Sequence, residues 1–352
     1  MKILYLGDDN PDFTSAHRAN ALRRLGHEVT VVNPRATLPR VSLVGGISTR
    51  LGLWPFAPWI DAAVRRQIGR DRFDLAWIDC GAEVSPGFHR WLQSKNVKIL
   101  NYNLDDPFGT RDGRKWDLYR RSVPLHDLTV VVRSENVAEA RIAGARNILQ
   151  VFRSYDPIAH APLNLTDQER RQWASDVVFV GSWMRERGPF MVRLLELGVP
   201  LSIWGNDWPK APEYERLRPA IRGAAVYGSD YVKTIQCAKI ALGLLSKGNR
   251  DLHTTRSAEV PFIGGAVFCA ERTVEHEAMY ADGEEAMFWT SPEDCARRCR
   301  AGLADPAGLQ KIADRGRRRV RQLQLANDEM ANAALAMLGR KGGVFEHALA
   351  SR

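Results

Sequence analysis

The run Asp176-Val-Val-Phe-Val-Gly181 is a short apolar segment that ends in glycine, and it repeats the pattern of Lys2-Ile-Leu-Tyr-Leu-Gly7 near the start of the chain. Such a run is typical of a buried strand that turns sharply into the next element. Apolar residues at helical spacing follow the first run from Ser15 to Leu25, and Gly26 ends them. Each half of the chain therefore begins with a predicted strand and turn, followed by a helix.

Further buried strands are predicted along both halves. Continuous β-branched runs that alternate with helical patterns indicate parallel sheets covered on both faces, so the fold class is α/β. At 352 residues the chain exceeds the size at which one hydrophobic core usually stops growing. The predicted strands are 27–33, 73–78, 97–104 and 128–133 in the first half, and 176–181, 200–205, 225–226, 240–245, 266–269 and 285–289 in the second.

These patterns predict two Rossmann-like doubly wound domains. The first covers 1–160, and a linker rich in proline and polar residues covers 161–175. The second domain covers 176–322, and 323–352 form a C-terminal helix and tail that we expect to pack back on the first domain. A single long helix is expected over about 309–338.

The composition is that of a soluble globular protein with an excess of positive charge. The formal net charge is +9, so the protein attracts polyanions such as nucleic acid, anionic lipid or sugar diphosphates. No apolar run reaches the roughly 18 residues that a membrane span needs. Five scattered cysteines indicate a reducing compartment, and hence a cytoplasmic protein. Cys295 and Cys299 could share a helical face, but no further cysteine or histidine cluster lies near them in the sequence, so we expect no metal site.

Two carboxylates seven residues apart mark the second half: Asp251-Leu-His-Thr-Thr-Arg-Ser-Ala-Glu259, followed by Val-Pro-Phe-Ile-Gly264-Gly265. On spacing alone, Asp251 could be a helix N-cap, and Glu259 could pair on the surface with Arg256 three residues earlier. The glycine pair and the later Glu-His-Glu run instead favour a binding site.

This order resembles the group 1 glycosyltransferases, whose Glu-x7-Glu element has the same spacing, with Asp251 in place of the first Glu. The run Arg256-x-x-Glu259-x-Pro261-x-x-Gly264-Gly265 is similar to the group related to spore maturation protein CgeB. The resemblance covers about 176–322 and implies the GT-B fold, in which two domains face a cleft. It also implies a glycosyltransferase that uses a nucleotide-sugar.

The resemblance implies a role for each residue of this segment. Glu259 would bind the ribose hydroxyls and Asp251 would face the sugar, although aspartate reaches one methylene less far than glutamate. A departing diphosphate needs cations, since electrostatic stabilisation is usually the largest catalytic contribution. Candidate donor-binding residues here are Arg256, Lys247, Arg250 and Gly264.

Gly181 and Ser182 stand where a strand gives way to a helix, so their N–H groups could approach a phosphate. Arg187 lies close behind them and favours this interpretation. A plain turn is the alternative. A Walker-type loop and a dinucleotide fingerprint are both absent.

Acidic residues also end strands in the first half. Asp105 and Asp106 precede Pro107, and one of them could deprotonate an acceptor hydroxyl in an inverting enzyme. Turn chemistry is the alternative, because Asp before Pro commonly starts a turn. His17, on the first helix, is a further candidate acid or base.

Trp54, Phe56 and Trp59 precede Arg65 and Arg66. Aromatic residues followed by basic ones suit a membrane-interface anchor or an acceptor-binding loop, and core packing is the alternative. The prolines at 55 and 58 are expected to exclude a regular helix through the aromatic residues.

We therefore predict a cytoplasmic glycosyltransferase of cell-surface glycan biosynthesis that works without a metal or other cofactor. Its partners would be a nucleotide-sugar, a glycan, lipid-linked or protein acceptor, and the anionic inner face of a membrane. The alternatives are a nucleotide-sugar epimerase of GT-B fold and a non-catalytic polyanion-binding protein. Nucleic acid is not expected, because no recognised binding signature is present.

Overall fold

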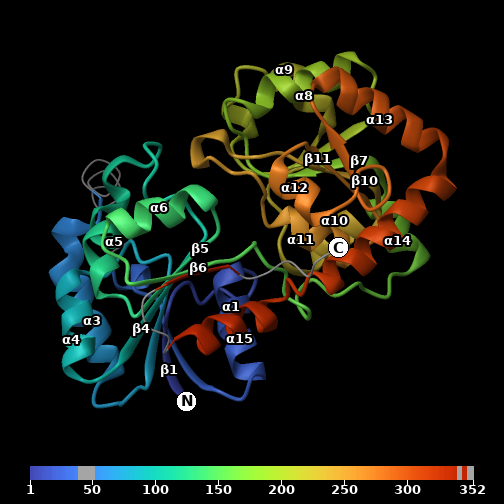
Figure 1. Ribbon diagram of the computed structural model, residues 1–352. Coiled ribbons are helices and arrows are strands. Elements are labelled where there is room, and N and C mark those ends of the chain that lie inside the picture. Colours follow the sequence, from blue (N-terminus) through green and yellow to red (C-terminus); the bar gives the residue numbers. More distant parts are fainter. Residues whose placement is uncertain (39–51, 339–342, 347–352) are drawn as a thin grey trace. The chain divides into compact units, whose positions relative to one another are not determined.

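The computed structural model describes residues 1–38, 52–338 and 343–346 and contains two units, each built round its own parallel sheet with helices on both faces (Figure 1). The first unit holds Met1–Phe152, Gly248–Arg250 and the described residues from Asn327 onward. The second holds Arg153–Lys247 and Asp251–Ala326. The α/β fold class with two doubly wound domains is confirmed.

The first unit contains a seven-stranded sheet in the order β13-β6-β5-β4-β3-β1-β2, in which neighbouring strands run parallel. Its strands are β1 (Lys2–Leu6), β2 (Glu28–Val32), β3 (Leu75–Asp79), β4 (Lys98–Asn103), β5 (Leu128–Val131), β6 (Asn147–Gln150) and β13 (Gly343–Glu346). Its α-helices within the described residues are α1 (Thr14–Arg24), α3 (Ala57–Ile68), α4 (Pro86–Ser94), α5 (Asp117–Ser122), α6 (Ser134–Ile142) and α15 (Asn327–Met337).

The second unit contains a six-stranded sheet in the order β12-β11-β10-β7-β8-β9, again with parallel neighbours. Its strands are β7 (Ser175–Val180), β8 (Leu201–Trp204), β9 (Ile221–Gly223), β10 (Ala238–Gly243), β11 (Val267–Glu271) and β12 (Met287–Trp289). Its α-helices are α7 (Asp167–Trp173), α8 (Arg187–Glu196), α9 (Tyr214–Leu217), α10 (Gly228–Gln236), α11 (Arg256–Ile263), α12 (Val274–Met279), α13 (Pro292–Ala304) and α14 (Pro306–Gln322).

The central strands are buried on both faces, which explains their continuous apolar sequences. All five residues of β3 are buried, and apolar side chains from α1 and α15 pack over one face of the sheet. The helices α1 and α15 lie side by side although about 300 residues separate them (Figure 1). Met330 and Ala334 of α15 belong to the same buried cluster as Leu22 of α1.

The structure differs from four expectations for individual elements. The long helix expected over 309–338 is two helices, α14 and α15, separated at Gln324, whose φ is 54°. The strand expected at 225–226 lies at β9 instead, and the expected linker 161–175 contains α7. The fourth expectation concerned the prolines near Trp59. Helix α3 runs through Trp59, since Pro58 occupies its first turn, where a missing N–H costs nothing.

The tail expected at 323–352 includes 339–342 and 347–352, and these lie outside the described residues. None of the described helices has the length and apolar character needed to cross a membrane.

Candidate functional site: the carboxyl edge of the six-stranded sheet

Most of the predicted donor-binding residues follow the carboxyl ends of strands in the second unit. Gly181 and Ser182 follow β7, and Lys247 and Asp251 lie beyond β10. The helix α11 then carries Arg256 and Glu259 in its first turns. The carboxyl ends of parallel strands meet at one edge of the sheet, and open α/β sheets bind ligands there.

The turn after β7 is held by hydrogen bonds to the Gly181 backbone. The Gly181 N–H donates to the carbonyl of Trp204 at 2.8 Å, and the Trp208 indole N–H donates to the Gly181 carbonyl at 3.0 Å. A Cβ atom on Gly205 would lie only 1.9 Å from the Gly181 oxygen, so only glycine fits at position 205. The glycine at position 205 thus lets the ends of β7 and β8 approach closely.

Arg187 is a buried cation beside this turn. Its Nη1 donates to the Ser182 carbonyl at 2.8 Å and its Nη2 to the Leu244 carbonyl at 3.3 Å, and its buried Nε has no hydrogen-bond partner. Burial lowers the pKa of Arg187 to about 10, with Glu186 and Asp251 opposing this effect and Arg256 adding to it, so it remains protonated at neutral pH. Among the described residues, Arg187 forms no ion pair with a carboxylate, and its positive charge can therefore attract an anion.

Glu259 and Arg256 form a buried pair on α11. The guanidinium of Arg256 donates to the Glu259 carboxylate, as does the Tyr231 hydroxyl at 2.8 Å, and the His160 Nε2 lies 3.7 Å from its other oxygen. Burial acts to raise the pKa of Glu259, but Arg256, His160 and Tyr231 outweigh it and hold the pKa below the ordinary value. The Arg256 Nε is 3.4 Å from the Val180 carbonyl, so this guanidinium also reaches the end of β7.

Asp251 lies in a buried network that the sequence did not reveal. Arg153 donates from Nη2 to Asp251 at 2.9 Å, and its backbone N–H donates to His253 Nε2 at 2.9 Å. His253 Nε2 therefore accepts, so Nδ1 carries the proton and donates to Glu275 at 2.5 Å. Arg153 and Glu275 hold Asp251 and His253 in place. No sequence signal pairs residues about 100 positions apart.

The two remaining predicted cations lie in different surroundings. Lys247 is exposed, and its Nζ pairs with Glu271. Arg250 belongs to the first unit, where its Nε is 2.6 Å from Asp106 and its Nη1 is 2.9 Å from Glu139. The structure therefore groups Arg250 with the predicted acidic pair.

That acidic pair contains one buried and one more accessible carboxylate. Asp106 is 3% exposed and accepts from Arg250 and from Asn136 Nδ2. Burial acts to raise its pKa, but these hydrogen bonds outweigh it and lower the pKa. Asp105 is less buried, and Lys115 Nζ lies 3.6 Å away. His17 is buried on α1.

The structure does not bring Gly264 to the donor-binding residues, so this expectation is corrected. Gly264 follows the last residue of α11 with φ 74°, and a Cβ atom added there would lie 3.1 Å from Arg317 Cδ. Because α11 runs back from the carboxyl edge of the sheet, Gly264 lies at the amino edge, just before β11. Glu259 and Gly264 are close in sequence but lie at opposite ends of one helix.

One group of possible metal ligands occurs in the part of the chain that the structure describes. The sulfur atoms of Cys269, Cys295 and Cys299 all lie within 4.8 Å of one another in the core of the second unit. The neighbouring thiols and burial hold the pKa of Cys269 well above its ordinary value, so this thiol stays protonated. The group offers three ligands, whereas structural zinc takes four.

Comparison with known proteins finds one family model that matches part of the chain. A family model described as "Glycosyl transferase-like" matches residues 185–334. This segment includes Arg187, Asp251, Arg256 and Glu259. The match favours glycosyl transfer over the epimerase and polyanion-binding alternatives. No curated protein sequence matches the chain.

Solved structures share the fold over almost the whole chain. A sucrose-phosphate synthase from Thermosynechococcus elongatus is 16% identical with a TM-score of 0.69, covering 96% of this chain and 97% of that one. Anabaena HepE in complex with UDP-glucose is 10% identical with a TM-score of 0.64, covering 96% and 99%. A putative UDP-N-acetylglucosamine 2-epimerase from Listeria monocytogenes is 14% identical with a TM-score of 0.56, covering 96% and 95%. At these identities the likeness establishes the fold alone.

Proposed function

We propose that this chain is a GT-B glycosyltransferase whose glycosyl transferase-like domain lies in residues 185–334. On this premise, it uses a nucleotide-sugar donor and needs no metal ion. The acceptor would be a glycan, a lipid-linked glycan or a protein. The resemblance to the CgeB-related group remains a prediction.

The observation that carries this proposal is the buried guanidinium of Arg187. Placing a charge without an ion-pair partner in a protein interior is costly, and such sites are often functional. Arg187 contacts two backbone carbonyls beside the Gly181-Ser182 turn and leaves its Nε without a partner. A diphosphate at this turn would neutralise the charge.

Two guanidiniums can stabilise the departing diphosphate in place of a metal ion. Arg187 and Arg256 both reach the end of β7, and charge-assisted hydrogen bonds from arginine to phosphate are about twice as strong as neutral ones. They would stabilise negative charge as the bond between sugar and phosphate breaks. HepE, a neighbour in fold, was solved with UDP-glucose bound, which supports this class of donor.

Glu259 is suited to orient the ribose. Its carboxylate is ionised and fixed by Arg256 and Tyr231, so it presents acceptor lone pairs in a defined direction. Asp251 is fixed in the same way by Arg153. Preorganised groups of this kind need no rearrangement when the substrate reacts.

Two routes are open for the acceptor proton. In a retaining reaction the departing phosphate takes it, and the acidic pair only positions substrates. In an inverting reaction Asp105 or Asp106 is the base. Asp106 is buried and its carboxylate is occupied by Arg250 and Asn136, which lower its pKa, so we assign the base in this route to the more exposed Asp105.

Calorimetry with UDP and UDP-glucose, with and without EDTA, tests the proposal. We expect Arg187→Gln to weaken nucleotide binding by about 10- to 100-fold, since a hydrogen bond to a charged group contributes about 1.5 to 3 kcal/mol. Glu259→Gln should also weaken nucleotide binding. Arg193→Gln, an exposed arginine on the same helix, is the matched control and should bind as the parent does. Unchanged nucleotide affinity in a folded Arg187→Gln variant, or loss of parent binding in EDTA, would overturn the proposal.

A further inference from the structure

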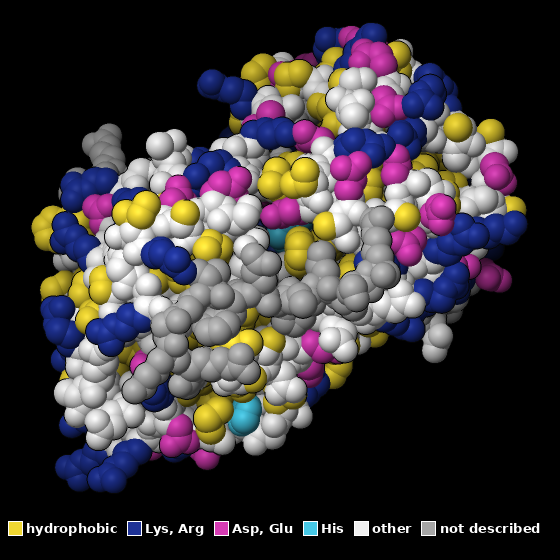
Figure 2. Space-filling model, viewed as in Figure 1, with side chains coloured by type: hydrophobic (Ala, Val, Ile, Leu, Met, Phe, Trp, Pro, Cys, Tyr) yellow, Lys and Arg dark blue, Asp and Glu magenta, His cyan; other side chains and the backbone are white. Residues whose placement is uncertain are grey.

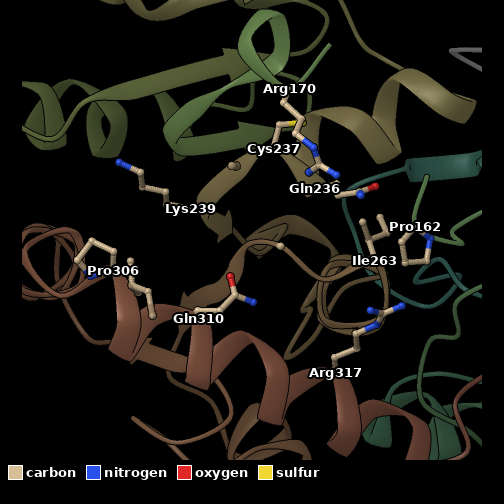
Figure 3. A pocket seen from close by; sticks show the side chains of 12 residues that line it. Pro162, Arg170, Gln236, Cys237, Lys239, Ile263, Pro306, Gln310 and Arg317 are labelled. Carbon is tan, nitrogen blue, oxygen red and sulfur yellow. The ribbon is translucent and has the colours of Figure 1, made fainter. Parts of the chain in front are cut away.

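Two sequence features are not explained by the donor site: the Gly264-Gly265 pair and the basic run near the end of α14. Both border a cavity of about 390 Å³ at the amino edge of the six-stranded sheet (Figure 3). Its lining includes Ala238 at the start of β10 and Arg317 of α14. All of its lining residues belong to the second unit, so the cavity is formed within one unit.

The glycine pair lets the chain pass closely behind the cavity. Gly265 has φ 88°, and a Cβ atom there would lie 2.3 Å from the Gln236 carbonyl. Gln236 itself exchanges two hydrogen bonds with the backbone of Leu163, each 2.9 Å long. Close backbone contact and hydrogen bonds therefore hold this side of the cavity in place.

The charged side chains at the cavity are cations, and none of its described lining residues is acidic. Arg317 reaches in from α14 on one side and Arg170 from α7 on the other (Figure 3). Lys239 stands at the margin, where its Nζ is 2.6 Å from Asp176. In the described part of the chain neither arginine forms an ion pair with a carboxylate.

Arg317 is the better placed of the two arginines. Its Nε is buried and has no hydrogen-bond partner. Partial burial and the nearby Arg321 lower its pKa, and the nearest compensating charge is Asp314 on the same helix. An anion in the cavity would neutralise the charge of the Arg317 guanidinium.

We propose that this cavity is a second ligand site, separate from the donor edge, that binds a small phosphorylated metabolite through Arg317 and Arg170. A guanidinium favours phosphate through forked hydrogen bonds, and each of the two arginines offers one such fork. The volume falls within the range of small-molecule sites and leaves room for a body larger than phosphate itself.

Calorimetry at low ionic strength with ribose 5-phosphate, inorganic phosphate and uncharged ribose tests the site. We expect ribose 5-phosphate to bind more tightly than inorganic phosphate and ribose to show no binding. Arg317→Gln should weaken ribose 5-phosphate about tenfold or more and leave UDP affinity unchanged. Arg317→Lys, which keeps the charge but loses the fork, should bind with intermediate affinity. Arg318→Gln, an exposed neighbour outside the cavity lining, is the matched control.

The donor variant separates this proposal from the donor site. Arg187→Gln should weaken UDP and leave ribose 5-phosphate bound at the amino edge. The second site is overturned if the parent does not bind ribose 5-phosphate, if Arg317→Gln leaves its affinity unchanged, or if Arg318→Gln weakens it equally. Equal weakening would mean a diffuse attraction to positive surface charge. Each of these results is independent of whether Arg187→Gln changes the affinity for UDP.

Discussion

The positive charges of buried arginines in this molecule have different partners. Arg18 donates from Nη2 to both oxygens of Asp79, at 2.9 and 2.7 Å, and Arg153 donates to Asp251. Each of these charges is paired, as buried charges normally are. Arg187 contacts carbonyl oxygens instead, which supports its assignment as a ligand-binding residue.

The acidic pair of the first unit yields a prediction in which the two residues behave differently. Asp105→Asn should lower turnover at least tenfold and leave nucleotide affinity unchanged, because a neutral amide cannot take a proton. Asp106→Asn should mainly lower the free energy of unfolding, because it removes the ion pair with Arg250. The loss should be about 1 to 2 kcal/mol, since Arg250 is partly exposed and water screens the pair. Steady-state kinetics and urea unfolding measure the two effects. Full activity in Asp105→Asn would show that this pair only shapes a turn.

Single residues could be predicted from the sequence where their partners are local. The three-residue spacing of Arg256 and Glu259 predicts their pairing, and the structure has it. The contact between Arg153 and Asp251 depends on how the sheet is assembled, so no local pattern reveals it. The resemblance places Gly264 in the same motif as Glu259, but the helix between them separates the two.

Among the elements, the strands were more predictable than the ends of the helices. Buried parallel strands are continuous apolar runs, and β3 and β7 are of this kind. The strand β6 has only two buried residues, Ile148 and Leu149, and too little pattern to stand out. The break between α14 and α15 is set by tertiary structure, since Ala326 pairs with Tyr155, far away in sequence.

Helix α11 contains a proline whose missing hydrogen bond is replaced from outside the helix. Pro261 cannot donate to the Ser257 carbonyl four residues earlier, and the Tyr280 hydroxyl donates to that oxygen at 2.7 Å. We expect Tyr280→Phe to lower the free energy of unfolding by about 1 to 3 kcal/mol, because it leaves a buried carbonyl unsatisfied.

A double-mutant cycle identifies the cause. In a Pro261→Ala background the new N–H can donate to Ser257, so Tyr280→Phe should cost less there than in the parent. Urea unfolding of the four proteins gives the coupling energy. Equal costs in both backgrounds would mean that the hydroxyl does not replace the helical hydrogen bond.

The stability of the whole molecule should depend on pH through buried histidines in both units. Burial lowers the pKa of His89 and His276 to about 4, and that of His126 well below its ordinary value. A depressed histidine pKa means that the unfolded chain binds more protons below about pH 6.5, so stability is lost as pH falls from 6.5 towards 4. At pH 5 the loss should be about 2 kcal/mol for each of His89 and His276.

Urea unfolding at pH 7.5, 6 and 5 measures this slope. Most carboxylates titrate below this window, so it isolates the histidines. His89→Gln should flatten the slope, whereas His27→Gln, at a less buried position, should change it little. A slope that does not change in His89→Gln would contradict the assignment.

Attachment to anionic membrane remains a proposal. Trp54 and Trp59 are 46% and 64% exposed, which favours a contact surface over core packing. Of the two basic residues behind them, Arg65 lies over the Trp91 ring of the same unit. Elsewhere, on the face shown in Figure 2, Lys and Arg are scattered among Asp and Glu. We therefore assign the proposed membrane contact to this local group of residues.

Sedimentation with anionic vesicles at low and high salt tests the attachment. The parent should pellet at low salt, since each basic residue near such a surface contributes about 1 kcal/mol, and Trp54→Ser/Trp59→Ser should pellet less. A parent that stays in solution at low salt would instead make these aromatic residues part of an acceptor-binding surface.

The packing of α15 against α1 has a consequence for the order in which the protein is made. A ribosome releases the first 152 residues long before it reaches residues 327–337, yet Met330, Ala331 and Ala334 complete the core of the first unit. Domains usually fold in the order of synthesis. Here the second unit, which is complete at Ala326, can finish folding first, and until α15 emerges the nascent first unit exposes apolar surface that a chaperone would recognise.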